Sequence, residues 1–176
     1  MARTASPERP VQLLDDIIGY LARHGLSDMS LRPLARAVGA SPRVLLYHFG
    51  SKEQLIARVF AELRRRQQRE IAALPDDGLV AATWRVWKQR SAPAQLPAFR
   101  LFFEALGLAI RSPRRHPDFL RASVEDWIAF AGPSRTLGTV VLAGLRGFLL
   151  DLCATGDRRR VDRAVRAWSA TLEALS

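Results

Sequence analysis

Cysteine and lysine are almost absent from this sequence. The single cysteine, Cys153, excludes an intramolecular disulfide and favours a reducing compartment. It lies in an apolar segment with no group that would hold it as the thiolate, so a reactive thiol is the weaker interpretation. Lys52 and Lys88 are the only lysines among the 27 lysines and arginines. Arginine suits bidentate contacts to phosphate or guanine, although a GC-rich genome would give the same bias.

The sequence also lacks the patterns of common catalytic and metal sites. Its three histidines, His24, His48 and His116, lie on different segments without cysteine or carboxylate at ligand spacing, so no metal site is predicted. No Ser-His-Asp set, glycine-rich phosphate loop or paired carboxylate motif is present. We therefore predict that the chain is not an enzyme and carries no cofactor.

Long hydrophobic runs are missing as well. The longest apolar stretch, TLGTVVLAGLRGFLLDL, is interrupted by Arg146 and is too short to span a bilayer comfortably. The opening MARTASPERP is followed by no apolar core of signal-peptide type. These features predict a cytoplasmic protein with no membrane partner.

What the chain does have is positive charge and enough apolar residues for a core. The 176 residues are 48% hydrophobic, which is enough for one or two small domains. The formal net charge is +10, which favours polyanionic partners such as nucleic acid. Both halves of the chain share this excess, so net charge does not locate a binding face.

Helical periodicity runs through nearly every segment, and no run alternates with period two over the length of a strand. We therefore predict an all-α fold of about nine helices. The first helix carries an apolar face and ends at Gly25, and the second begins at Ser30 and ends at Gly39. A third helix from Ser41 to Phe49 is very short.

A long helix is predicted over residues 51–74, opening with a capping box formed by Ser51 and Gln54. Pro75-Asp76-Asp77-Gly78 then forms the clearest boundary in the sequence. Asp157 can cap the last helix, where three arginines follow directly. The helices expected after the boundary lie near 79–91, 97–111, 117–131, 134–155 and 158–175.

The short third helix has the geometry of the second half of a helix-turn-helix. Leu34, Val38, Leu45 and Phe49 would pack the two helices together. The opposite side of the short helix is then free to enter a major groove of DNA.

The stretch LSDMSLRPLARAVGASPRVLLYHFGSKEQL resembles the N-terminal DNA-binding domain of the tetracycline-repressor (TetR) family of bacterial transcription regulators. The matching positions are Ser30, the set Leu34, Ala35, Val38 and Gly39, and then His48, Phe49, Lys52 and Leu55. The resemblance implies a helix-turn-helix domain over 1–55 and a helical regulatory and dimerisation domain over 56–176.

The resemblance also implies where DNA is contacted. Arg43 falls where family members touch bases, with guanine as the favoured partner. His48 is either a phosphate contact, as in the family, or a packing residue at a helix end. The family often has Tyr two residues before this His, where the present chain has Leu46 followed by Tyr47, so that phosphate contact is in doubt. The full predicted DNA-binding set is Ser30, Arg32, Ser41, Pro42, Arg43, Val44, Leu46, Tyr47, His48 and Lys52.

Aromatic residues recur at helical spacing after residue 80, which most often means a plain core. The family holds a small inducer in this domain, so some rings are candidates for a pocket. The candidate pocket residues are Trp87, Phe103 and Trp127, with Arg100, Glu104 or Asp126 as polar anchors.

The last two helices carry apolar stripes with small residues. Such stripes could lie on a membrane surface, but small residues on two adjacent helices favour close helix packing. By resemblance they form an isologous dimer interface. The predicted interface residues are Leu137, Val141, Leu145, Phe148, Leu152, Val161, Val165, Trp168 and Leu172.

Together these features predict a cytoplasmic, homodimeric transcription regulator of the repressor type that binds a pseudo-palindromic operator and is released by a small-molecule inducer. When bound to DNA it would be associated with the nucleoid. Two alternatives remain open: a helical interaction module whose helix-turn-helix no longer reads DNA, and a small-molecule-binding or catalytic bundle.

Overall fold

The computed structural model describes residues 9–27, 29–73, 78–130 and 134–173. Over these ranges the chain forms nine α-helices, one short 3-10 helix and no strand, which confirms the predicted all-α class. The elements are α1 (Arg9–His24), α2 (Leu31–Ala37), α3 (Pro42–Phe49), α4 (Lys52–Ala72), α5 (Leu79–Arg90), α6 (Leu96–Arg111), η1 (Pro113–Arg115), α7 (Pro117–Phe130), α8 (Arg135–Thr155) and α9 (Arg158–Glu173). The predicted ends at 74, 131 and 175 lie outside the described residues.

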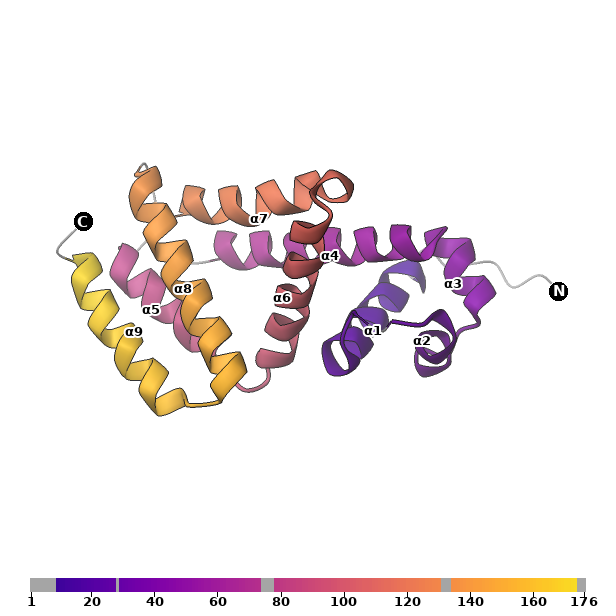
Figure 1. The fold of residues 1–176 in the computed structure, drawn as a ribbon, viewed down its shortest axis with the longest axis horizontal. Helices are drawn as coiled ribbons and strands as arrows, with labels where there is room; N and C mark the ends of the chain where they lie inside the picture. Colours follow the sequence, from indigo (N-terminus) through magenta and orange to yellow (C-terminus); the bar gives the residue numbers. More distant parts are fainter. Residues whose placement is uncertain (1–8, 28, 74–77, 131–133, 174–176) are drawn as a thin grey trace.

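Helices α1, α2 and α3 gather at one end of the elongated molecule, and α4 runs from them toward the other helices (Figure 1). Their shared core contains Ile17, Leu21, Leu34 and Leu45, each at most 1% exposed. The cluster continues beyond these three helices to α4, α6 and Phe119 of α7. The first helices therefore do not form their core alone.

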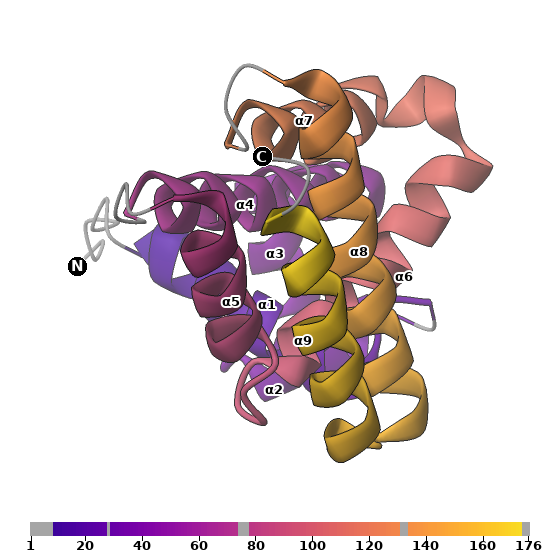
Figure 2. The same cartoon turned by 90° about the vertical axis from the view of Figure 1, so that its left-hand side faces the viewer.

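A second core joins α5, α7, α8 and α9, and Figure 2 shows α8 and α9 side by side on the outer face of the molecule. The termini of these helices are set by local hydrogen bonds. The Ser134 hydroxyl accepts from Leu137 N, and Gly156 ends α8 with φ +70°. Asp157 accepts from Arg160 N at 3.1 Å, which confirms its predicted capping role.

The stripe predicted as a dimer interface belongs instead to this second core. Val141, Leu145, Leu152, Val161, Val165 and Leu172 are each at most 3% exposed within the single chain, and Leu137, Phe148 and Trp168 pack against them. Side chains already buried by their own chain offer no surface to another. Six of the nine predicted interface side chains are thus buried within the chain, and Leu137, Phe148 and Trp168 remain half-buried.

The other face of α8 carries an exposed, uncharged stripe. Its positions recur at intervals of three and four residues, so they lie along one side of the helix. The stripe consists of Thr136, Val140, Ala143, Gly147, Leu150 and Ala154. Val140 and Leu150 are 38% and 53% exposed.

Helix α8 is also the one described helix that is long and apolar enough to cross a bilayer. By itself this is weak evidence for a membrane span, since the core helix of a globular protein meets the same criterion. Here the buried face of α8 is fully engaged in the second core.

A close contact between α8 and α9 depends on a glycine. A Cβ added at Gly144 would lie 2.3 Å from Cζ2 of Trp168, whose ring also makes an edge contact with Phe148. We predict that Gly144→Ala lowers the free energy of unfolding by about 1 to 3 kcal/mol, because the indole must move within a packed core.

Urea denaturation of the two proteins measures this difference. Gly107→Ala on α6 is the matched control, because nothing lies within 4 Å of its added Cβ. That change should instead stabilise the helix by about 0.5 to 1 kcal/mol. Equal effects of the two substitutions would contradict the close packing at Gly144.

Candidate nucleic-acid interface and ligand cavity

Helix α3 turns one side into the core and the other toward solvent. Leu45 and Phe49, one turn apart, are buried as predicted. On the opposite side Tyr47 is 81% exposed and Leu46 is 42% exposed, and Arg43 is also exposed. Arg43 and Tyr47 are separated by one helical turn, so they lie on the same face.

Both ends of α3 are fixed by the residues that the sequence indicated. The Ser41 hydroxyl accepts from Val44 N at 3.2 Å, and Gly50 ends the helix with φ +79°. Directly afterwards Ser51 N donates to Gln54 Oε1 at 2.9 Å while Gln54 N donates to Ser51 Oγ, which confirms the capping box of α4. The short helix is thus held between two capped ends.

The remaining residues of the predicted DNA-binding set surround this helix. Ser30 occupies the N-cap position of α2, but its side chain makes no capping hydrogen bond. It is exposed, as are Arg32 and Ser41. Half-buried positions are taken by Pro42, Val44, His48 and Lys52. The His48 ring meets the edge of Tyr47, with centroids 5.2 Å apart.

A cavity of about 200 Å³ lies between the two ends of the molecule. Six helices contribute to its wall: α1, α4, α5, α6, α7 and α8. The lining residues are Ile18, Leu63, Arg66, Gln67, Glu70, Val86, Arg90, Gln95, Ala98, Phe99, Phe102, Phe103, Trp127, Leu142, Leu145, Arg146 and Leu149. The cavity is therefore bordered both by the long helix α4 and by a residue of α1.

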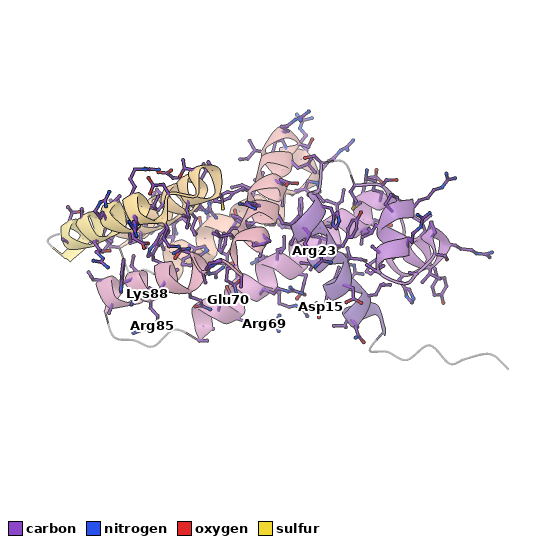
Figure 3. All side chains as sticks on the ribbon, turned by 90° about the horizontal axis from the view of Figure 1, so that it is seen from below. Asp15, Arg23, Arg69, Glu70, Arg85 and Lys88 are labelled. Atoms are coloured by element: carbon purple, nitrogen blue, oxygen red, sulfur yellow. The ribbon has the colours of Figure 1, made fainter. Side chains whose placement is uncertain are left out.

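Two arginines of this wall are largely withdrawn from water. Arg90 forms an ion pair with Glu70 and lies over the rings of Phe99 and Trp127, at 5.3 and 5.6 Å from their centroids. Burial lowers the pKa of Arg90, and the Glu70 carboxylate opposes that shift. Figure 3 shows Glu70 on α4 with Arg85 and Lys88 of α5 to one side and Asp15 of α1 to the other.

Arg146 comes from the middle of the apolar helix α8. Its guanidinium donates a hydrogen bond to the carbonyl oxygen of Ser123 and lies 5.5 Å from the centroid of the Phe102 ring. Burial lowers the pKa of Arg146 to about 10, so the side chain remains charged at neutral pH.

The structure brings only two of the six predicted pocket residues into the cavity wall, Phe103 and Trp127. Trp87 is 1% exposed in the second core, and its indole N–H donates to Asp162 of α9 at 2.9 Å. Asp126 pairs with Arg64 of α4 at 3.2 Å.

The other two predicted anchors also have different surroundings. Glu104 accepts a hydrogen bond from Leu26 N, next to the turn at Gly25 that ends α1. Arg100 is exposed and lies near Cys153. Burial raises the pKa of the Cys153 thiol despite the opposing effect of Arg100, in agreement with an unreactive thiol.

No group of three or more His, Cys, Asp or Glu side chains that could hold a metal ion occurs within the described ranges. His116 packs against Phe60, with ring centroids 4.9 Å apart. Burial, together with Arg115, lowers its pKa. His116 therefore has a packing role in the described structure.

Comparison with known proteins agrees with the helix-turn-helix geometry. Residues 13–59 match the family described as bacterial regulatory proteins, tetR family. The chain belongs to the tetR family. The matched residues include α2, α3 and the first turns of α4, which form the part of the molecule described above as a candidate nucleic-acid interface.

Similarity to known proteins extends over nearly the whole length of this family member. The HTH-type transcriptional regulator BetI of Rhizobium meliloti (strain 1021) is 25% identical over 175 residues, covering 92% of this chain and 74% of that protein. A transcriptional regulator from Rhodococcus sp. Rha1 has a similar fold, with a TM-score of 0.76, 17% identity, and coverage of 93% of this chain and 95% of the other. The multidrug binding protein EbrR, in complex with imidazole, also has a similar fold, with a TM-score of 0.74 and 21% identity. The match covers 97% of this chain and 93% of EbrR. The family consists of regulatory proteins, and the Rhizobium and Rhodococcus relatives are transcriptional regulators, not enzymes.

Several cavity residues of this tetR-family protein were not predicted. They include Arg90, Arg146, Gln67, Glu70 and two phenylalanines of α6. Arg146 did carry a signal, since a charge in the middle of an apolar helix calls for a specific environment. The others lie in ordinary amphipathic patterns, where sequence periodicity does not distinguish a core from a cavity.

The polar part of α4 is tied to its neighbours by ion pairs. Glu62 is only 5% exposed and pairs with Arg65, Arg66 and Arg69, and Arg66 also reaches Asp15 of α1. Each of the arginines 64 to 66 therefore has a carboxylate partner.

Burial by itself would raise the pKa of Glu62, but hydrogen bonds from Arg66 and Arg65 outweigh it, and the pKa lies below the ordinary 4.5. The unfolded chain thus binds this proton more readily than the folded chain. The stabilisation by ionised Glu62 is present above pH 4.5 and is lost as the pH falls through the lower folded-state pKa.

We predict that Glu62→Gln lowers the free energy of unfolding at pH 7, by about 1 to 3 kcal/mol, because buried charge-assisted hydrogen bonds are lost. The difference from the wild type should shrink on acidification below pH 4.5, as the native carboxyl itself becomes neutral. Denaturant titrations at a series of pH values measure this. A difference that is constant with pH would show that Glu62 is not ionised in the folded state.

Proposed function

We propose that this tetR-family regulator is a homodimeric repressor that binds a pseudo-palindromic operator in the cytoplasm and is released by a small organic ligand. The observation that carries this proposal is the exposed face of α3, clamped by the caps at Ser41 and Ser51. Two such helices would enter successive major grooves from one side of the duplex. The same family relation supports residues 1–55 as the DNA-binding domain and 56–176 as the regulatory domain.

Arg43 is our candidate for direct readout, since it is exposed and a guanidinium pairs well with O6 and N7 of guanine. Ser30, Arg32, Ser41 and Lys52 suit phosphate contacts. Pro42, Val44, Leu46, Tyr47 and His48 complete the proposed contact set. Tyr47 is well exposed for a backbone contact and could replace the tyrosine that the family often has one residue earlier.

The exposed stripe of α8 is our candidate for the dimer interface, in place of the buried stripe expected at first. It carries no charge over its six positions, from Thr136 to Ala154, in a chain in which 25% of residues are charged. Small residues in such a stripe let two helices approach closely. Packing of α8 and α9 against their copies would give a four-helix contact around a two-fold axis.

The cavity is placed to couple ligand binding to the DNA-binding helices. Its wall includes Ile18 of α1 and four residues of α4. Helix α6 lines the cavity with three phenylalanines and also holds the end of α1 through Glu104. A ligand that binds more tightly when α1, α4 and α6 are shifted would change the spacing of the two α3 helices, and only such differential affinity would release DNA.

We predict that Leu150→Glu converts the dimer to a monomer, because a charge would have to be buried in the α8 interface. Analytical ultracentrifugation of the purified chain measures the change in mass. Ile110→Glu on α6 is the matched control, since Ile110 is 61% exposed and lies outside the stripe. If Leu150→Glu remained dimeric, the proposed interface would be wrong.

Selection from a random duplex library at roughly physiological salt tests DNA reading directly, and an enriched inverted repeat is the expected result. With that operator, Arg43→Ala should cost about 1 to 3 kcal/mol of binding free energy and relax the preference at one base pair of each half-site. Competition binding against operators varied at each position measures both effects. Unchanged preference at every position would rule out Arg43 as a base-reading residue.

Lys52→Ala is the contrasting variant. It should weaken binding to all DNA sequences alike and lower the slope of log K against log salt by about one unit, because a phosphate contact is lost without loss of base readout. A library that yields no motif with the wild-type protein would favour the interaction module over the sequence-reading repressor.

A further inference from the structure

The charges around the cavity do not balance. Arg66 is paired with Glu62 and Asp15, and Arg90 is paired with Glu70. Arg146, in contrast, has no carboxylate within ion-pair distance in the described part of the chain. One guanidinium of the cavity wall is thus left without a counter-charge.

The position of Arg146 makes this imbalance costly. Its only hydrogen-bond acceptor within the described residues is a neutral backbone carbonyl, that of Ser123. A guanidinium has five N–H donors, and removing it from water without an opposite charge is unfavourable. The lowered pKa has burial as its sole cause and reflects the same penalty. A bound anion would supply the missing charge and the missing acceptors.

A second donor on the wall is also unsatisfied. Gln67 is 8% exposed, and its amide nitrogen Nε2 is buried without a hydrogen-bond partner. Oε2 of Glu70 also lacks a hydrogen bond by geometry, but it is in ion-pair contact with Arg90. Among the described residues of the cavity wall, the unsatisfied polar atoms without a charged partner are therefore donors, which require an acceptor-rich ligand.

The rest of the wall fits a small, flat, apolar body. Four rings line it, those of Phe99, Phe102, Phe103 and Trp127. The volume of about 200 Å³ is somewhat larger than the roughly 150 Å³ that accommodates benzene in a protein interior. A single aromatic ring with a carboxylate is of this size, and aromatic rings pack well against one another in edge and offset arrangements.

We propose that the cavity binds a small aromatic carboxylate, with its anionic group on Arg146 and its ring among the phenylalanines of α6. The assignment rests on the proposed ligand response and names the class of ligand.

Benzoate, benzamide and benzamidine test the assignment, because they have nearly the same shape and carry negative, zero and positive charge. Isothermal titration of the wild-type protein at constant ionic strength should show benzoate binding at least tenfold more tightly than the other two. Inorganic phosphate should not compete with benzoate at equal concentration. Absence of benzoate binding, equal binding of benzamide or benzamidine, or equal competition by phosphate would each overturn the proposal.

Variants of Arg146 locate the anion. Arg146→Gln should remove the preference for benzoate over benzamide, while Arg146→Lys should restore part of it. The control Arg121→Gln removes an exposed arginine of α7 and should leave the preference unchanged. Arg146→Gln should not lower the melting temperature of the ligand-free protein, because a buried, unpaired charge is removed. If Arg146→Gln kept the preference for benzoate, Arg146 would not be the anion site.

These titrations do not depend on DNA. If the protein selected no inverted repeat but bound benzoate through Arg146, the proposed function would fail and the ligand class would stand. If it bound an operator that benzamide or benzamidine released, with benzoate inactive, the function would stand and the ligand class would be wrong.

Discussion

The charged stretch of α4 forms ion pairs with three other helices, and these pairs help to set the position of the two ends of the molecule relative to each other. Arg66 reaches Asp15 of α1, Arg64 reaches Asp126 of α7, and Glu70 reaches Arg90 of α5. Partly exposed ion pairs of this kind contribute little stability each. Their geometric demands are nevertheless specific, so they favour one position of α4 relative to its neighbours.

Arg146 is the exception to this pairing, and its place in α8 connects stability with function. A leucine or methionine there would suit the apolar helix better and would avoid the desolvation of a charge. A charged side chain that is retained despite this desolvation cost is expected where it binds a ligand. The donor of Gln67, buried on the same cavity wall, points to the same conclusion.

Much of the helix-turn-helix could be predicted from the sequence because its signals are local. The ends of the helices are fixed by contacts over three or four residues, made by Ser41, by Gly50 and by the pair Ser51 and Gln54. The burial of Leu45 and Phe49 follows from helical period alone. Helix bounds that fall within the described residues agree with expectation to within one or two residues, but the short helix η1 was not foreseen.

Capping and helical periodicity predict the all-α class, the described helix bounds and the exposed face of α3, because both depend on residues close in the chain. The packing of the helices against one another decided which side of α8 is core, since Val141 and Leu145 face inward and Val140 and Leu150 outward from a helix that is apolar on both sides. It also decided which aromatic residues line the cavity and which arginines find a carboxylate. Those outcomes depend on contacts between residues that are tens of positions apart, and no local pattern records them.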